Sequence, residues 1–134
     1  MQTSEPRYFV WTESFTVKAF EIDADGRALL SVLANYMQEA AGSHAARLGF
    51  AMEKLFEQGQ GWVLNRFTMQ ITRYPKSGEM IRIETWPSAA DRLFGYRDFD
   101  LYDETGEHIL SARTAWLIID IEKRRPLPTP DVVK

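Results

Sequence analysis

One segment with helical periodicity, residues 29–48, constrains this chain more than any other feature, because the remaining patterned segments are mostly typical of strands. At about 100° per residue, one stripe of such a helix is apolar apart from a single histidine, and the opposite stripe is polar. The first stripe comprises Leu30, Leu33, Met37, Ala41, His44 and Leu48, and the second comprises Ser31, Asn35 and Glu39. Gly49 is a suitable left-handed C-terminal cap. We therefore expect one long helix that buries its apolar stripe.

The other patterned segments predict strands, because they are rich in β-branched and aromatic residues or alternate apolar and polar side chains. The expected strands are residues 8–22, 62–74, 79–86, 92–102 and 108–121, with a loop at 87–91 and a short second helix at 52–56. In the second strand, Val63 is expected to share an apolar face with Phe67, Met69 and Ile71. The last strand is the most apolar and is expected in the interior of the sheet.

These elements predict an α+β domain with the hotdog fold, in which a curved antiparallel sheet wraps one long central helix. A chain of 134 residues fits one domain, since it can bury on the order of two-thirds of its unfolded surface. We place this domain at residues 1–122. Residues 123–134 begin with a basic run and hold three prolines in five residues, which cannot join the interior of a sheet. We expect them to form an extended tail or linker.

Composition excludes several classes of function. The net charge of -3 argues against general nucleic-acid binding, which leaves a basic footprint. The absence of cysteine removes disulfides and thiolate ligands, and two separated histidines form no metal-ligand pattern. No apolar run approaches the roughly 20 residues that span a bilayer. We therefore expect a cytoplasmic protein with no metal, no cofactor, no nucleic-acid partner and no membrane span.

Several short motifs resemble the N-terminal half of the acyl-acyl-carrier-protein thioesterases of bacteria and plants. They are the Gln38-Glu39 pair followed by His44, Leu48-Gly49, Trp62-Val-Leu-Asn-Arg66, Arg73-Tyr-Pro75, Gly78-Glu79, Thr85-Trp86, Arg97-Asp-Phe99, Trp116-Leu117 and Arg124-Arg-Pro126. The resemblance implies two hotdog units in tandem and hydrolysis of the thioester between a fatty acyl chain and its carrier protein. It also implies that the first unit accommodates the acyl chain.

The family's catalytic Asn-x-His signature lies in its second hotdog unit, and this sequence contains no Asn-x-His. Those catalytic residues therefore carry over to no position here. We expect the chain either to be the first half of a larger protein or to pair with a second copy. A lone hotdog unit would leave one edge of its sheet open, which favours association.

Asn35 and Glu39 are the candidate catalytic residues, because they lie one turn apart on the polar stripe. If a second unit covers that stripe, Glu39 is placed to act as general base for water while Asn35 orients the thioester. If nothing covers it, both are solvated helix residues. His44, on the apolar stripe, is expected to be a buried, hydrogen-bonded core residue, and His108 is expected to be exposed.

The candidate substrate-binding residues are Leu29, Gln38, Trp62, Asn65 and Trp86. The tryptophans are candidates to line an acyl tunnel, with core packing as the alternative. The amides of residues 27–30 are a candidate oxyanion site, with ordinary helix capping as the alternative. The cations of Arg66, Arg73, Lys76, Arg92 and the run 123–125 would suit an acidic carrier protein or its phosphate, unless they are scattered surface charges.

Two functions remain open from the sequence. The first is hydrolysis of fatty acyl thioesters of acyl carrier protein or coenzyme A. The alternative is a non-catalytic acyl-binding hotdog module that needs a second hotdog unit for activity. A dehydratase or hydratase is a third possibility, but His44 is misplaced for that chemistry.

Overall fold

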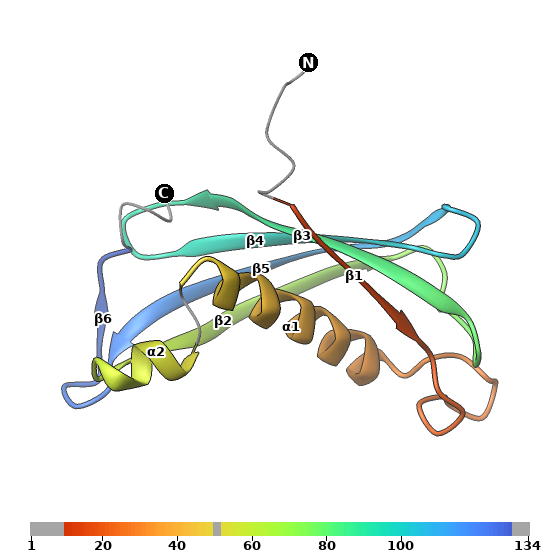
Figure 1. Ribbon diagram of the computed structural model, residues 1–134, viewed down its shortest axis with the longest axis horizontal. Helices are drawn as coiled ribbons and strands as arrows, with labels where there is room; N and C mark the ends of the chain where they lie inside the picture. Colours follow the sequence, from red (N-terminus) through yellow and green to blue (C-terminus); the bar gives the residue numbers. More distant parts are fainter. Residues whose placement is uncertain (1–9, 50–51, 130–134) are drawn as a thin grey trace, which may run out of the picture.

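The computed structural model describes residues 10–49 and 52–129, which form one antiparallel sheet and two helices (Figure 1). The elements are β1 (Trp11–Thr16), α1 (Leu30–Arg47), α2 (Met52–Glu57), β2 (Gln60–Ile71), β3 (Met80–Ala90), β4 (Gly95–Tyr102), β5 (His108–Asp120) and β6 (Arg125–Leu127). The strand order is β1-β3-β4-β5-β2, and β6 pairs with β5. The curved sheet covers α1 from one side, which confirms the predicted α+β class. Neither of the two helices is both long and apolar enough to cross a lipid bilayer.

The buried stripe of α1 differs from the predicted one at both ends. Leu30 and Leu48 are 44% and 40% exposed, although both were expected in the core. Tyr36 and Ala40 are buried instead, together with Leu33, Met37, Ala41 and His44. The stripe is therefore wider in the middle of the helix than the periodicity suggested, because α1 packs there against both β1 and β3.

A β-bulge in β2 overturns the predicted position of Val63. Leu64 pairs with Trp116 and Arg66 pairs with Ala115, so that Asn65 is an extra residue opposite no partner. The extra residue reverses the alternation, and Val63 is 39% exposed on the outer face. On the N-terminal side of the bulge, Trp62 and Leu64 take the inner face that Phe67, Met69 and Ile71 occupy beyond it.

Three predicted boundaries also differ. β3 continues through the expected loop at 87–91, with a second register shift between Pro87 and Ala89. β4 begins at Gly95, after a turn in which Asp91 Oδ1 accepts hydrogen bonds from the amides of Leu93 and Phe94. Of the expected strand at 8–22, only Trp11–Thr16 is a strand, and residues 8 and 9 lie outside the described residues.

β5 lies between β2 on one side and β4 and β6 on the other, which confirms its predicted interior position. β6 pairs with residues 118–120 of β5, so residues 125–127 of the expected tail join the sheet as a short strand, after a turn that includes residues 123 and 124. The Thr129 amide donates to the Arg92 carbonyl at 2.9 Å, and Thr129 is buried. The division of the chain at residue 122 stays a prediction.

Tyr36 connects α1 to β1 and to the loop before the helix through its ring and its hydroxyl. Its ring stacks on Phe15 at 4.6 Å, and its hydroxyl donates to the Glu21 carboxylate and, at 3.3 Å, to the Thr16 carbonyl. Burial and the Glu21 carboxylate raise the pKa of Tyr36, and the same hydrogen bond lowers the pKa of Glu21.

The substitution Tyr36→Phe keeps the stacked ring and removes only the hydroxyl. We expect it to lower the free energy of unfolding by about 1–2 kcal/mol, because one hydrogen bond to a charged group is lost. Urea denaturation followed by circular dichroism measures the change. An unchanged midpoint would show that the Tyr36–Glu21 contact does not stabilise the loop.

Candidate functional site

The predicted catalytic pair lies on the exposed surface of α1. Asn35 and Glu39 are one helical turn apart and both are exposed. No residue that the structure describes covers them, so the described residues do not supply the surroundings that a general base needs. Their catalytic roles stay a prediction that depends on a covering surface.

Two predicted substrate-binding residues lie on the same helix. Leu29 immediately precedes α1 and is 40% exposed. Gln38 is half-buried, and its buried Oε1 accepts no hydrogen bond from the described residues. Because Gln38 and Glu39 follow Asn35 by three and four residues, each of them neighbours Asn35 on the helix surface.

The predicted oxyanion site at the start of α1 is wrong for three of its four amides. The Arg27 amide donates to Asp23 Oδ1 at 3.1 Å, the Ala28 amide donates to the Pro75 carbonyl at 2.8 Å, and the Leu29 amide donates to the Glu21 carbonyl at 3.0 Å. These donors are engaged within the protein, so they are not available to a thioester oxygen.

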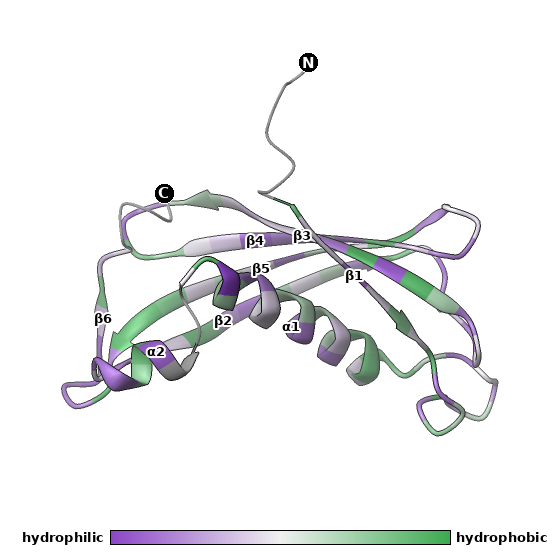
Figure 2. Ribbon diagram, viewed as in Figure 1, coloured by the Kyte–Doolittle hydropathy of each residue, from purple (hydrophilic) through white to green (hydrophobic). Residues whose placement is uncertain are grey.

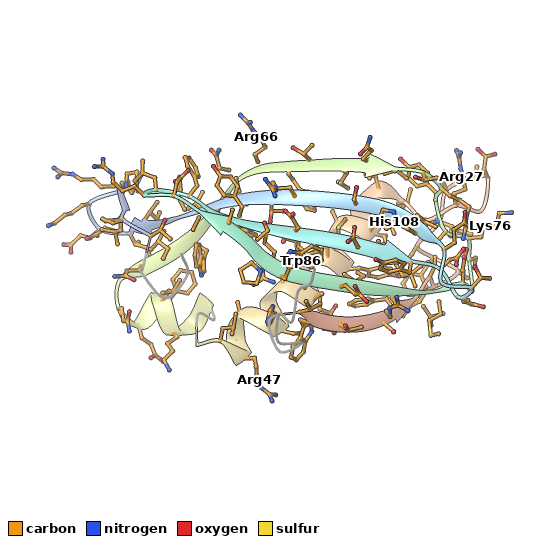
Figure 3. The ribbon with its side chains drawn as sticks, turned by 90° about the horizontal axis from the view of Figure 1, so that it is seen from above. Arg27, Arg47, Arg66, Lys76, Trp86 and His108 are labelled. Carbon is orange, nitrogen blue, oxygen red and sulfur yellow. The ribbon has the colours of Figure 1, made fainter. Side chains whose placement is uncertain are left out.

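The two candidate tryptophans lie on opposite faces of the sheet. Trp62 is on the inner face, half-buried and edge-on to Trp116 at 6.3 Å. Trp86 alternates with the buried Thr85 and lies on the outer face (Figure 3). Asn65 is the exposed bulge residue at the edge of β2. The structure therefore does not bring Trp62, Asn65 and Trp86 into one pocket.

Sequence analysis missed a polar cluster on the inner face, in which the half-buried Arg97 of β4 contacts the buried His44 and Thr85. Arg97 Nη1 lies 3.0 Å from His44 Nδ1 and donates to Thr85 Oγ1 at 3.2 Å. His44 is 1% exposed and stacks on the Trp11 ring at 5.7 Å. The prediction of a buried, hydrogen-bonded His44 is confirmed. Because a guanidinium only donates, His44 Nδ1 accepts, and the proton of the neutral ring is on Nε2.

Burial lowers the pKa of Arg97 to about 10. A cation loses hydration when it is buried, and an ion pair with a carboxylate normally compensates for this loss. No described carboxylate forms such a pair with Arg97, since its hydrogen-bond partners are an imidazole and a hydroxyl.

The alternation of inward and outward side chains along β4 was the sequence signal that could have predicted the inward position of Arg97. Arg97 has the same parity as the buried Phe99 and Leu101, so the strand pattern directs it inward.

Most of the cations proposed to meet a carrier protein are exposed, but Arg73 is not available. Arg73 forms a two-point ion pair with Glu79, at 2.6 and 3.1 Å, and Nη2 also contacts Asp103 Oδ2 at 2.7 Å. The Arg73 guanidinium lowers the pKa of Glu79, and hydrogen bonds from Thr105 and Arg73 lower the pKa of Asp103. This cluster joins the β2–β3 connection to the β4–β5 turn.

The other cations point into solvent at separate places. Figure 3 shows Arg66 projecting from the edge of the sheet and Lys76 at one end of the molecule. Arg92 and residues 123–125 are exposed as well. His108 is also exposed, as predicted, and its Nε2 lies 2.8 Å from Asp100 Oδ1. These positions do not form one basic surface.

Comparison with known proteins assigns the chain to a protein family. The family model described as the acyl-ACP thioesterase N-terminal domain matches residues 9–134. The chain belongs to the acyl-ACP thioesterase family. This confirms the resemblance seen in the sequence, and the helix wrapped by an antiparallel sheet is the hotdog fold of that family.

Curated members of the acyl-ACP thioesterase family match nearly the whole chain. The chain is 29% identical to a chloroplastic palmitoyl-acyl carrier protein thioesterase of Gossypium hirsutum, over 93% of this chain and 32% of the relative. It is 31% identical to chloroplastic oleoyl-acyl carrier protein thioesterase 2 of Arabidopsis thaliana, over 94% of this chain and 36% of the relative. The chain thus spans about a third of the length of these relatives.

Solved structures give the same correspondence. A crystal structure of an acyl-ACP thioesterase from Bacteroides thetaiotaomicron superimposes with a TM-score of 0.85 at 33% identity, over 88% of this chain and 49% of that one. A DHNA-CoA thioesterase from Staphylococcus aureus superimposes with a TM-score of 0.82 at 18% identity, over 80% of its length. The second likeness concerns the fold alone.

Proposed function

We propose that the protein hydrolyses fatty acyl thioesters, and that this chain is the hotdog unit that accommodates the acyl chain. The observation that carries the proposal is the match of the acyl-ACP thioesterase N-terminal domain to residues 9–134. Relatives named as palmitoyl- and oleoyl-acyl carrier protein thioesterases support a fatty acyl thioester as substrate, and acyl carrier protein as the carrier. A cytoplasmic location stays a prediction from composition.

We propose that a second hotdog unit, in a second copy or elsewhere in the full-length protein, pairs with this one. Among the described strands, β2 pairs with β5 alone, which leaves the other edge of a 12-residue strand open. An open edge of this length is a template for pairing with another strand. Leu29 and Leu30, both exposed at the start of α1, add apolar surface for such a partner.

Covering α1 would also change the surroundings of Asn35 and Glu39. In the proposed mechanism, Glu39 takes a proton from water as the water attacks the thioester carbonyl, and Asn35 donates a hydrogen bond that orients the carbonyl. The C–S bond then breaks, and the protonated Glu39 returns the proton to the leaving thiolate. The Asn-x-His residues of a second unit are the other candidates for this chemistry. The exposure of Asn35 and Glu39 supports a second candidate function, in which this unit binds the acyl chain and its partner alone is catalytic.

Substitution distinguishes the two functions. In the full-length protein, we expect Glu39→Gln to lower kcat for dodecanoyl thioesters of acyl carrier protein by about 10²–10⁴-fold, the usual loss for a missing general base. Glu57→Gln, at an exposed glutamate of α2, is the matched control and is expected to leave kcat unchanged. The assay follows release of the free thiol. If Glu39→Gln and Asn35→Ala both leave kcat unchanged, this unit has no catalytic role and the acyl-binding function is favoured.

The pairing is tested by light scattering on the purified full-length protein. We expect a particle that contains two hotdog units, whether from one chain or from two. A stable particle with a single hotdog unit at micromolar concentration would contradict the proposed pairing.

A further inference from the structure

Arg97 lies at a boundary on the inner face of the sheet. On one side of it, Phe99 and Leu101 are 1% and 0% exposed and belong to the closed core. On the other side, Leu64 and Trp116 face each other across the β2–β5 ladder and are only half-buried. Figure 2 shows that β5 is hydrophobic along this part of its length. The inner face beyond Arg97 is therefore apolar and incompletely covered.

Only one side of the Arg97 guanidinium donates hydrogen bonds to described residues. Nη1 contacts His44 Nδ1 and Thr85 Oγ1, both uncharged acceptors when the imidazole is neutral. Nε and Nη2 donate to no residue in the described ranges 10–49 and 52–129. These two nitrogens form the edge of a guanidinium that binds a carboxylate through two parallel hydrogen bonds.

The hydroxyls of Thr85 and Thr114 and the indole of Trp116 already have hydrogen-bond partners of their own. Thr85 Oγ1 donates to the Asp98 carbonyl at 2.9 Å, and Thr114 Oγ1 donates to the Arg97 carbonyl at 3.2 Å. Trp116 Nε1 donates to Thr114 Oγ1 at 2.8 Å, so the indole presents its apolar ring. The site thus offers one fork of cationic donors beside apolar surface, which matches a carboxylate attached to a hydrocarbon chain.

We propose that the Nε–Nη2 edge of Arg97 binds the carboxylate of a fatty acid, whose chain lies along the half-buried apolar side chains of the inner face. The choice of a fatty acid rests on the proposed function, since hydrolysis of an acyl thioester releases one. A carboxylate side chain of a second hotdog unit has the same chemistry and is the other source that the experiment distinguishes.

Binding of decanoate and decan-1-ol to the full-length protein, measured by isothermal titration calorimetry below the micelle concentration, tests the proposal. The alcohol has the same chain length and no charge. We expect decanoate to bind at least about tenfold more tightly than decan-1-ol, because a charge-assisted bidentate pair is formed only with the acid. We expect Arg97→Lys to weaken this preference, since lysine keeps the charge but lacks the fork.

Arg113→Lys is the matched control. Arg113 is an exposed arginine on the outer face, and its Nε and Nη2 already bind Asp98 at 2.7 and 3.0 Å. This variant is expected to keep the preference for decanoate. Thermal unfolding of each variant checks that it is folded, and the wild-type comparison of acid with alcohol needs no variant at all.

Equal binding of acid and alcohol by the wild-type protein, or a preference that is undiminished in folded Arg97→Lys, overturns the proposal. If decanoate does not bind and Arg97→Lys weakens the pairing of hotdog units, the Nε–Nη2 edge binds a carboxylate of the second unit. This result also overturns the proposal of a fatty acid. Thioester hydrolysis is measured separately in the wild-type protein. If the protein prefers decanoate but hydrolyses no thioester, the carboxylate site is supported and the proposed function is rejected. If it hydrolyses thioesters but shows no preference for decanoate, only the carboxylate site is rejected.

Discussion

Replacing Phe99 by alanine is expected to lower the free energy of unfolding by about 3–5 kcal/mol. Phe99 is 1% exposed in the interior strand β4, and its ring stacks on Phe67 at 6.4 Å. Ala112 of β5 and Thr85 of β3 flank it on the inner face, and both are too small to fill the space that the ring would leave. The loss combines the transfer of the ring from water with the cavity that remains. Urea denaturation measures it.

Phe20→Ala is the matched control for Phe99→Ala. The same side chain is removed, but Phe20 is 81% exposed in the loop after β1. We expect a change within about 0.5 kcal/mol, as is usual for surface substitutions. Equal losses in the two variants would contradict the placement of Phe99 at the centre of the core.

Arg73→Met is expected to lower the free energy of unfolding by about 2 kcal/mol at neutral pH. The substitution leaves the carboxylates of Glu79 and Asp103, which one guanidinium now holds together, facing each other without a cation. The side chain of Arg73 is 35% exposed, so water screens part of the interaction and the loss is smaller than for a fully buried ion pair.

The pH dependence of this loss follows from the lowered pKa values. The folded-state pKa of Glu79 and that of Asp103 both lie below the ordinary range. Their stabilisation is therefore present above the unfolded-state pKa, and it is lost as the pH falls through the folded-state values. We expect the difference in stability between wild type and Arg73→Met to shrink from pH 7 to pH 3.

The control for this cluster is Arg27→Met. Arg27 also contacts two carboxylates, Asp23 at 3.5 Å and Asp25 at 3.3 Å, but it is 49% exposed. We expect a loss of well under 1 kcal/mol, as for other exposed ion pairs. Denaturation midpoints across the pH range compare the two variants, and a loss for Arg27→Met as large as that for Arg73→Met would refute the structural role of the Arg73 cluster.

The predicted order of elements agrees with the structure because it depends on local patterns. A helix over residues 29–48 and strands around 62–74 and 108–121 follow from the spacing of apolar side chains, and each lies within a few residues of its predicted bounds. The burial of His44 followed in the same way, since it shares a helical stripe with Leu33 and Met37.

The errors occur where strand pairing overrides the local pattern. A β-bulge depends on the partner strand, so the extra residue Asn65 could not be recognised from β2 alone, and Val63 was assigned to the wrong face. Proline is typical of a loop, but Pro87 pairs with Arg97 of β4 and therefore lies in β3. The candidate tryptophans were separated for the same reason, because face and register together decide which side chains meet.

The sequence by itself determined the α+β class, the single long helix, the interior position of β5 and the family, because periodicity and short motifs are properties of neighbouring residues. Only the tertiary structure decided which charges are paired. It brought Arg73 to Glu79 and Asp103 across two turns, and it placed Arg97 against His44 without a described carboxylate. Such contacts join residues far apart in the chain, and their energies depend on burial and on the local dielectric, which no local pattern contains.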